Sequence, residues 1–287
     1  MNGTQALRSF GRWVRSSALA GATALVALTV GWIGAPTPAA HAATPITIVT
    51  IGFDDGTLDQ FDTLPVLQAH GMSATFFINT GPILAGDPAH MTVAQLTDLD
   101  NAGNEIAGHT VDHANIQPLS TADARAEVCT DRNTLLGWGF QPTSFAYPFG
   151  SYNAASETVV LDCGYNSGRT VSGVSIHVAK NKIGETVPPA DPYATRTPPN
   201  PKKATKLKTM EQYVLNAEAG VQATGQTLWI QFVFHRYCDA HCGAYTVQPA
   251  KFTALLDFLL AETAAGRVSV QTTAQVIGGP VNPPVAP

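Results

Sequence analysis

The sequence predicts an α/β fold in which parallel strands alternate with helices and roll into an incomplete barrel. Short apolar, β-branched runs alternate with longer segments of helical spacing from residue 47 to residue 271. Polar residues follow several of these runs directly, as they do where a barrel carries its active site. The expected strands number about six or seven, which favours an incomplete barrel over a regular eightfold one. An open doubly wound sheet also satisfies this periodicity.

The elements follow one another in order. We expect strands at residues 47–51, 73–79, 105–108, 144–147, 228–234 and 268–271. We expect helices at residues 61–70, 91–102, 120–137, 154–162, 210–220 and 249–265. Thr92 and Ser120 have the chemistry of helix N-caps, while Gly71 and Gly103 are typical of the residue after a helix. Residues 185–208 are rich in Pro, Thr and Lys and are expected to form a long surface loop.

Residues 1–42 have the composition of a signal peptide. Three arginines precede an apolar stretch at residues 18–34, and Ala40-His41-Ala42 has the small-x-small pattern of a signal peptidase site. The apolar stretch is near the lower length limit for a membrane span, so an uncleaved anchor is the alternative. The sequence therefore predicts a secreted, extracellular protein.

The charge of the mature chain excludes some partners. The whole chain has a formal net charge of −5, and loss of three arginines with the leader lowers it to about −8. Such a chain is a poor partner for nucleic acid or acidic lipid. We expect a monomer without membrane insertion after cleavage. Its catalytic domain is predicted at residues 43–278, followed by a Pro-rich tail at residues 279–287.

The four cysteines agree with export, because secreted proteins commonly pair their cysteines. Three pairings are possible. We expect Cys129–Cys163 and Cys238–Cys242, because each cysteine then has a partner nearby in the chain. The alternative is a metal or redox site at residues 238–242. Its potential ligands are packed too tightly to complete a tetrahedron without a distant fourth.

The residues with catalytic potential follow expected strands. Asp54 and Asp55 follow the first strand, His109 and His113 follow the strand at 105–108, and His235 follows the strand at 228–234. Loops after parallel barrel strands meet on one face, so these side chains are expected to lie together. Two imidazoles and one carboxylate can hold a divalent metal with positions open for water and substrate. The other carboxylate can take a proton from water, and a separate histidine can protonate a leaving group.

Each of these features alone is weak. Asp-Asp-Gly is a common turn, His-x-x-x-His occurs by chance, and a histidine at the end of an apolar strand is most often a core residue. The combination, all after strands, is much harder to obtain by accident. It indicates a metal-dependent hydrolytic site.

The same residues resemble the motifs of NodB-like polysaccharide deacetylases (carbohydrate esterase family four). Residues 51–56 (IGFDDG) are similar to the family's TFDDG motif, and residues 108–113 (GHTVDH) to its H-[ST]-x-x-H motif. The stretches ATFFI at 74–78 and NEIAGH at 104–109 also match. The similarity runs from about residue 47 to about residue 272. It implies a distorted (β/α)7 barrel.

The resemblance also implies a role for each residue. Asp55, His109 and His113 would hold the metal, Zn²⁺ foremost and Co²⁺ as an alternative. Asp54 would be the general base. His235, in a Val-Phe-His sequence that is similar to the family's L-x-H motif, would be the general acid.

The third motif departs from the family pattern. The family often has R-P-P-Y-G, whereas residues 146–150 read AYPFG, so the arginine that orients the base is absent. The longer form FAYPFG resembles a branch of the family. Tyr147 and Phe149 are expected at the substrate groove, with the backbone N–H of Phe149 at the oxyanion. Arg196 is expected to replace the missing guanidinium, and Arg169 is a second candidate.

The function implied is a secreted, metal-dependent deacetylase. N-acetyl groups of an N-acetylglucosamine polymer, such as chitin, peptidoglycan or poly-N-acetylglucosamine, are the foremost substrate. An O-acetyl xylan esterase on the same scaffold is the alternative within the enzyme class. A carbohydrate-binding barrel that has lost catalysis is the alternative outside it, and the missing arginine is its best support.

Overall fold

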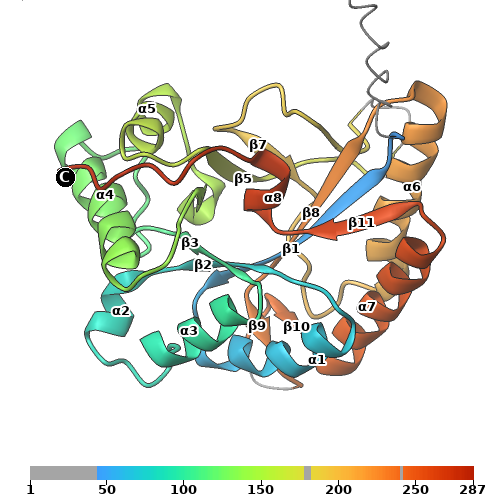
Figure 1. Ribbon diagram of the computed structural model, residues 1–287, viewed down its shortest axis with the longest axis horizontal. Coiled ribbons are helices and arrows are strands. Elements are labelled where there is room, and N and C mark those ends of the chain that lie inside the picture. The colour runs from blue at the N-terminus through green and yellow to red at the C-terminus, as the bar shows by residue number, and fades with distance from the viewer. Residues whose placement is uncertain (1–43, 178–181, 240–241) are drawn as a thin grey trace, which may run out of the picture. The chain divides into compact units, whose positions relative to one another are not determined.

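Parallel strands form the wall of a barrel at the centre of the protein (Figure 1). The computed structural model describes residues 44–177, 182–239 and 242–287, so the predicted signal peptide lies outside the described residues. Neighbours in the main sheet pair in parallel in the order β8, β1, β2, β3, β4, β5, β7. In chain order these strands are β1 (Thr47–Asp55), β2 (Thr75–Ile78), β3 (Glu105–Gly108), β4 (Ser144–Ala146), β5 (Ser167–Gly173), β7 (Thr195–Thr197) and β8 (Leu228–Phe234).

Two further strands lie beside this wall. β11 (Val268–Gln271) pairs in parallel with the amino-terminal half of β1, whose carboxyl-terminal half pairs with β2. β6 (Glu185–Thr186) pairs antiparallel with β8. A separate small sheet joins β9 (Arg236–Tyr237) to β10 (Thr246–Val247).

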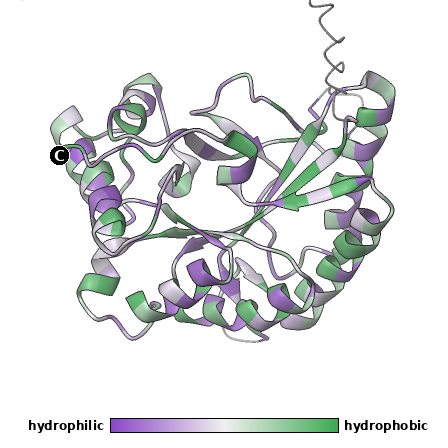
Figure 2. Cartoon of the chain, viewed as in Figure 1, coloured by the Kyte–Doolittle hydropathy of each residue, from purple (hydrophilic) through white to green (hydrophobic). Residues whose placement is uncertain are grey.

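Helices connect the strands and cover the outside of the sheet. They are η1 (Leu58–Thr63), α1 (Leu64–Ala69), α2 (Thr80–Leu84), α3 (Val93–Asn101), α4 (Thr121–Gly137), η2 (Pro148–Gly150), α5 (Ala154–Asp162), α6 (Leu207–Thr224), α7 (Pro249–Ala264) and α8 (Thr273–Ile277). Figure 1 shows α4 and α5 on one side of the sheet and α6 and α7 on the opposite side. The helices carry hydrophobic and hydrophilic residues side by side (Figure 2). In the described ranges, no helix has both the length and the hydrophobicity needed to cross a membrane.

Side chains, and not a backbone ladder, connect β7 to β8. Within the described chain β7 pairs only with β5. The side-chain amide of Gln231 on β8 donates to the carbonyl oxygen of Arg196 on β7 at 2.9 Å. Arg196 in turn forms an ion pair at 2.7 Å with Glu185 on β6. The barrel is therefore nearly closed, and the distorted seven-stranded form is confirmed.

An aromatic cluster sets the direction of the strand ends. The ring of Phe53 stacks on Phe76 with centroids 5.2 Å apart, and it also contacts Phe234 and Phe252. Successive side chains of a strand point to opposite faces. Burying Phe53 against the helices therefore turns the next side chain, Asp54, into the barrel.

Most expected elements are confirmed, and three of the differences affect the barrel. The helix expected at 61–70 is split into η1 and α1, because Pro65 near the start of α1 cannot donate a backbone hydrogen bond. The loop expected at 185–208 contains β6 and β7, which are two and three residues long and too polar to form an apolar run. β5, which begins Ser-Gly-Arg-Thr, is a strand that the sequence analysis did not predict.

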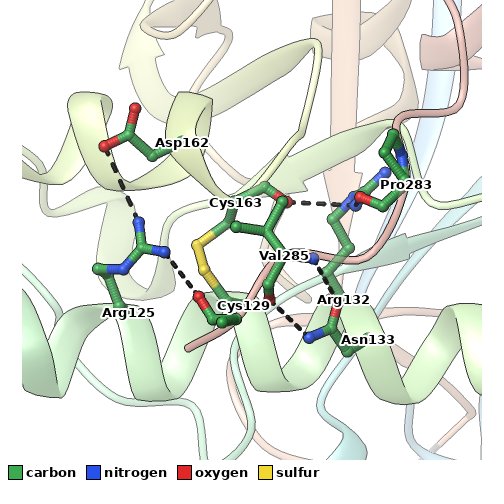
Figure 3. The surroundings of a disulfide bond; sticks show 9 residues. Arg125, Cys129, Arg132, Asn133, Asp162, Cys163, Pro283 and Val285 are labelled. Atoms are coloured by element: carbon green, nitrogen blue, oxygen red, sulfur yellow. Dashed lines mark hydrogen bonds and ion pairs between the residues drawn. A yellow bond between two sulfur atoms is a disulfide. The ribbon is translucent and has the colours of Figure 1, made fainter.

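Residues 279–287 do not form a tail outside the domain, which corrects the boundary expected at residue 278. Arg132 on α4 donates to the carbonyl oxygens of Asn282 and Pro283 at 2.7 Å and 3.2 Å. The side-chain amide of Asn133 donates to the carbonyl oxygen of Val285 at 2.8 Å. Figure 3 shows Pro283 and Val285 next to Arg132 and Asn133, beside the disulfide that joins α4 to the end of α5. The C-terminal segment is thus part of the same unit as the barrel.

Candidate active site

The five predicted catalytic and metal-binding residues lie in one pocket at the carboxyl ends of the strands. Its volume is about 360 Å³, within the range of small-ligand sites. The pocket is lined by Asp54, Asp55, His109, His113, Tyr147, Phe149, Gly150, Val171, Asn200, His235 and Tyr245. β1, β3, β4, β5 and β8 each end at it, so the barrel topology brings these distant positions together.

Asp55, His109 and His113 offer three ligand atoms that face one another. The Oδ1 atom of Asp55 lies 3.6 Å from Nε2 of His109 and 3.4 Å from Nε2 of His113. All three atoms lie within 4.8 Å of one another. Oδ1 of Asp55 is buried and has no hydrogen-bond partner among the described residues. A buried unpaired carboxylate oxygen next to two imidazole nitrogens fits a divalent cation with N and O ligands.

Hydrogen bonds behind the pocket orient His109 for this role. Its Nδ1 lies 2.7 Å from the carbonyl oxygen of Ala146, which leaves Nε2 free to face Asp55. The backbone N–H of His109 donates to Oδ2 of Asp131 at 3.1 Å, and the side chain of Asn79 donates to the carbonyl oxygen of His109. Burial raises the pKa of Asp131 to about 7. His109 is therefore held by both its ring and its backbone.

The electrostatics of the site keep Asp55 ionised. Burial alone would raise the pKa of Asp55, but the nearby imidazole of His109, with the charges of His235 and His113, holds it well below its usual range. Burial and the charge of His109 lower the pKa of His113, which favours its neutral form. A charged carboxylate and a neutral imidazole are the forms that bind metal.

The backbone around the pocket is strained. Positive φ values occur at Asp55 (82°), Thr110 (70°), His113 (56°) and Phe149 (61°), and elsewhere among the described non-glycine residues only at Ser172. This left-handed conformation is unfavourable for residues other than glycine. Its concentration at the pocket is typical of functional sites, where the surrounding structure holds residues in strained positions.

Asp54 is held by Arg169. Nη2 of Arg169 lies 2.6 Å from Oδ1 of Asp54, and both residues are almost fully buried. The guanidinium also lies over the ring of Phe77, 4.8 Å from its centroid. In the β4–β5 ladder Arg169 is the partner of Ala146. Ala146 stands where the third motif of the family has its arginine, so the guanidinium comes from the neighbouring strand.

Arg196, the first candidate for this role, does not reach the pocket. Its guanidinium donates to both carboxylate oxygens of Glu185, at 2.7 Å and 2.8 Å. The side chain of Arg196 crosses from β7 to β6, where it helps to close the barrel. The expectation that Arg196 replaces the missing arginine was therefore wrong, and the second candidate, Arg169, occupies that place.

His235 lies next to the carboxylate oxygen of Asp54 that Arg169 does not contact. Its Nε2 is 3.8 Å from Oδ2 of Asp54, and its ring packs on Tyr245 with centroids 5.2 Å apart. The fully buried Gln60 donates through Nε2 to the carbonyl oxygens of Asp54 at 2.5 Å and His235 at 2.6 Å. A single amide thus connects the ends of β1 and β8. Gln60 sets the spacing of the two residues assigned to proton transfer.

Tyr147 and Phe149 line the pocket as expected, in different ways. Tyr147 is 1% exposed, and its hydroxyl has no partner in the described chain. Burial raises the pKa of Tyr147 well above its ordinary value, so the hydroxyl stays protonated. Phe149 is 67% exposed, and its ring packs edge-on against His113. Tyr147 therefore forms a buried, polar part of the pocket wall, and Phe149 forms an exposed, aromatic part of its rim.

The sequence analysis missed several residues at or behind the pocket, among them Gln60, Asn200 and Tyr245. Gln60 lies in a short 3-10 helix, Asn200 in a loop after the unpredicted strand β7, and Tyr245 before the two-residue strand β10. Oδ1 of Asn200 is buried and unpaired within the described chain. The sequence gives no sign of these residues, because none of them directly follows a predicted strand.

Both expected disulfides are present. Cys129 is joined to Cys163, and Cys238 to Cys242. The second disulfide follows β9 and lies near the end of the strand that carries His235. Its cysteines are oxidised, so the alternative of a thiolate metal site at residues 238–242 does not hold in this structure.

Comparison with known proteins agrees with this geometry. Residues 41–168 match the family model described as polysaccharide deacetylase. This part of the chain carries the pattern of the polysaccharide deacetylase family. The match includes Asp54, Asp55, His109 and His113, and it ends just before Arg169 and well before His235.

Two curated relatives match part of this chain. One is the Putative polysaccharide deacetylase YxkH of Bacillus subtilis (strain 168), 32% identical over 124 residues, which are 42% of this chain and 44% of the relative. The other is the Probable peptidoglycan-N-acetylglucosamine deacetylase of Arthroderma benhamiae, 30% identical over 41% of this chain and 27% of the relative. The chain thus spans less than half the length of either relative.

Solved structures share the fold of this chain. A family 4 carbohydrate esterase from Streptomyces lividans in complex with acetate covers 83% of this chain and 98% of its own, with a TM-score of 0.50 and 18% identity. BA3943 from Bacillus anthracis, described as a pseudoenzyme of the same family, covers 80% of this chain and 65% of its own, with a TM-score of 0.50 and 13% identity. At these identities the likeness establishes the barrel fold.

Proposed function

We propose that this protein is a metal-dependent deacetylase that hydrolyses N-acetyl groups of a polymer containing N-acetylglucosamine, such as chitin, peptidoglycan or poly-N-acetylglucosamine. One observation carries the proposal. The unpaired Oδ1 of Asp55 faces the Nε2 atoms of His109 and His113, beside a second carboxylate, Asp54, that an arginine holds in place. The match of residues 41–168 to the polysaccharide deacetylase model supports the same reaction class.

Asp55, His109 and His113 would hold the metal, with Zn²⁺ the foremost candidate and Co²⁺ an alternative. A divalent cation at this place supplies Lewis acidity, which lowers the pKa of water and polarises the acetyl carbonyl. Asp54 is separate from this ligand set, because Arg169 occupies one of its carboxylate oxygens. Its other oxygen, Oδ2, faces His235 and the pocket.

The residues of the chain account for the proton transfers. Asp54 takes a proton as the oxygen of water attacks the acetyl carbon, and a tetrahedral intermediate forms. His235 then gives its proton to the amide nitrogen as the C–N bond breaks, which yields acetate and a free amine on the sugar. The backbone N–H of Phe149 and the pocket wall at Tyr147 would bind the acetyl group and its oxyanion.

An acetate-release screen tests this function. The full chain, stripped with a chelator and reloaded with Zn²⁺ or Co²⁺, is assayed on chitin oligomers, peptidoglycan, poly-N-acetylglucosamine and acetylated xylan. Metal-dependent acetate release from an N-acetylglucosamine polymer is the expected result. Release from acetylated xylan alone would assign the chain to O-acetyl esters instead. Full activity in the metal-free protein would refute the scheme.

A catalytically inactive carbohydrate-binding barrel is the second candidate. The pseudoenzyme among the fold relatives and the altered third motif favour it. The Arg169–Asp54 pair argues against it, because it restores the contact that the motif lacks. Absence of acetate release from every polymer, together with retained binding, would establish this alternative.

We also propose that the protein acts outside the cell as a monomer after cleavage behind residue 42. The leader-like composition of residues 1–42 and the two disulfides support secretion, because disulfides persist in oxidising compartments. Amino-terminal sequencing of protein from culture supernatant tests the cleavage site. Protein found only in the membrane fraction would contradict it.

A further inference from the structure

The lysines of this acidic chain are concentrated at one place. The sequence contains seven lysines, none before residue 180, and five of them lie at positions 202, 203, 206, 208 and 251. We refer to Lys202, Lys203, Lys206, Lys208 and Lys251 as the lysine cluster. A local excess of one charge in a chain of opposite net charge creates a focused field at that part of the surface.

Hydrogen bonds to backbone groups hold Lys251 next to the segment that carries the other four lysines, although they are separated in the sequence. The ammonium of Lys251 on α7 donates to the carbonyl oxygens of Lys203 and Thr205, each at 2.8 Å. The backbone N–H of Lys203 donates to the carbonyl oxygen of Ala244 at 2.9 Å. The turn that carries Lys202 and Lys203 is therefore fixed against the segment that carries Tyr245.

The cluster adjoins the candidate active site. The ammonium of Lys202 lies over the ring of Tyr245, 5.2 Å from its centroid. The other neighbour of this ring is His235, at 5.2 Å. Asn200, two residues before Lys202, lines the pocket itself. A continuous row thus runs from the proposed general acid through an aromatic ring to the first lysine.

This is the side on which the rest of a polymer must lie. In the proposed reaction His235 protonates the nitrogen that remains on the sugar, while the acetyl group stays near Asp55 and its histidines. The sugar ring and its neighbours in the chain therefore extend from the pocket on the side of His235. Tyr245 and Lys202 are the next groups in that direction.

The positive charges of the cluster are not neutralised by the protein. None of the five lysines forms an ion pair with any carboxylate in the described ranges, although Arg125, Arg196, Arg236 and Arg267 do. Glu211 on α6 is one turn from Lys208 but forms no ion pair with it in the described part of the chain. The side chains of Lys202, Lys203, Lys206 and Lys208 are exposed. These four ammonium groups are available to an external anion.

We propose that the lysine cluster binds negatively charged groups of the glycan chain, carboxylates or phosphates on sugars next to the one that is deacetylated. Lysine suits this role, because a flexible point charge follows an anion without requiring bidentate geometry. A neutral glycan offers nothing to these charges, and a glycan made cationic by deacetylation is repelled by them. The inference rests on the proposed function for the identity of the substrate, but the anion-binding surface is testable without turnover.

The kinetic test compares two substrates in two proteins. The substrates are a neutral N-acetylglucosamine hexasaccharide and a hexasaccharide that alternates N-acetylglucosamine with glucuronate. The variant replaces Lys202, Lys203, Lys206 and Lys208 with Gln and keeps Lys251, whose ammonium holds the turn. The ratio of kcat/KM on the anionic substrate to that on the neutral one should fall about tenfold in the variant. This is the loss expected when several weak surface charge contacts are removed together. Lys182→Gln, an exposed lysine outside the cluster, should leave the ratio unchanged.

The binding test identifies the source of the negative charge. Fluorescein-labelled oligoglucuronate and poly(glycerol phosphate) are titrated with the full chain and with the fourfold variant, with fluorescence anisotropy as the readout. A Kd weakened about tenfold for either probe supports the cluster and names its anion, and the wild-type affinity should fall as salt rises towards about 0.5 M. Unchanged Kd values for both probes, or an equal loss of kcat/KM on both hexasaccharides, would overturn the proposal. If no substrate releases acetate but the anisotropy difference is present, the proposed function fails and the anion-binding surface stands.

Discussion

Arg169, on β5, donates to Asp54 at 2.6 Å. The family motif places its arginine on the neighbouring strand, at the position of Ala146 on β4. Both residues are almost fully buried, so neither charge is stabilised by solvent. Removal of one partner of a buried ion pair leaves an uncompensated charge. This pair therefore fixes the position of the carboxylate that is assigned to accept a proton from water.

Replacement of Arg169 with Met should lower kcat about a hundredfold, because Asp54 would lose its charge partner and its orientation. It should also lower the free energy of unfolding by about 3–5 kcal/mol. Metal content should stay unchanged, since Arg169 contacts no candidate ligand. The matched control is Arg196→Met, which breaks an ion pair with the buried Glu185 and should lower stability while kcat is retained. Equal losses of kcat in the two variants would show that Arg169 acts only on stability.

Gln60→Met should lower kcat about tenfold without loss of metal. Met has nearly the same shape but no N–H group, so the carbonyl oxygens of Asp54 and His235 would lose their shared donor. Leaving buried acceptors unpaired should cost about 1–3 kcal/mol in stability. Gln231→Met is the control, because it removes a buried amide that donates to a carbonyl oxygen away from the pocket. Retention of full kcat in Gln60→Met, measured beside its melting temperature, would remove Gln60 from the site.

His235→Ala should reduce turnover of N-acetyl substrates by roughly 10²–10⁴, the usual range for general acid–base catalysis. The loss on an activated acetyl ester should be clearly smaller, because a good leaving group needs no proton. Metal content should not change. If His235 served only to pack against Tyr245, the two substrates would lose activity equally and the melting temperature would fall.

The two disulfides should contribute unequally to stability. Reduction or Cys→Ser replacement at Cys129–Cys163 opens a loop with a sequence separation of 34 and should cost about 3–4 kcal/mol. Cys238–Cys242 has a separation of 4 and should contribute only about 1–2 kcal/mol. Denaturant unfolding of the two single-disulfide variants measures both values. A larger loss for Cys238–Cys242 would mean that it holds more than its own short loop.

The sequence predicts the metal-binding part of the site well, for a physical reason. Asp55 ends β1, and His109 and His113 follow β3. A buried strand that ends in a polar residue is visible in a single sequence. Barrel topology then determines that these residues meet. The same logic places His235 at the end of β8, a continuous apolar run.

The parts that the sequence does not predict depend on short or polar strands. β5 and β7 carry Ser, Gly, Thr and Arg, because they face the pocket and the closing seam of the barrel. Without those strands, the choice between Arg169 and Arg196 had no geometric basis. The register that pairs Arg169 with Ala146 settles it, and register is a property of the folded sheet.

The most direct test of the metal-dependent mechanism compares Asp54→Asn with Asp55→Asn. Bound metal is measured by elemental analysis, and acetate release is measured on the same preparations. Asp55→Asn should lose metal and activity together, because a neutral amide is a weaker ligand than a carboxylate. Asp54→Asn should keep the metal and lose turnover, because an amide cannot accept the proton from water. Loss of metal in Asp54→Asn, or turnover in Asp55→Asn protein that contains no metal, would contradict the account.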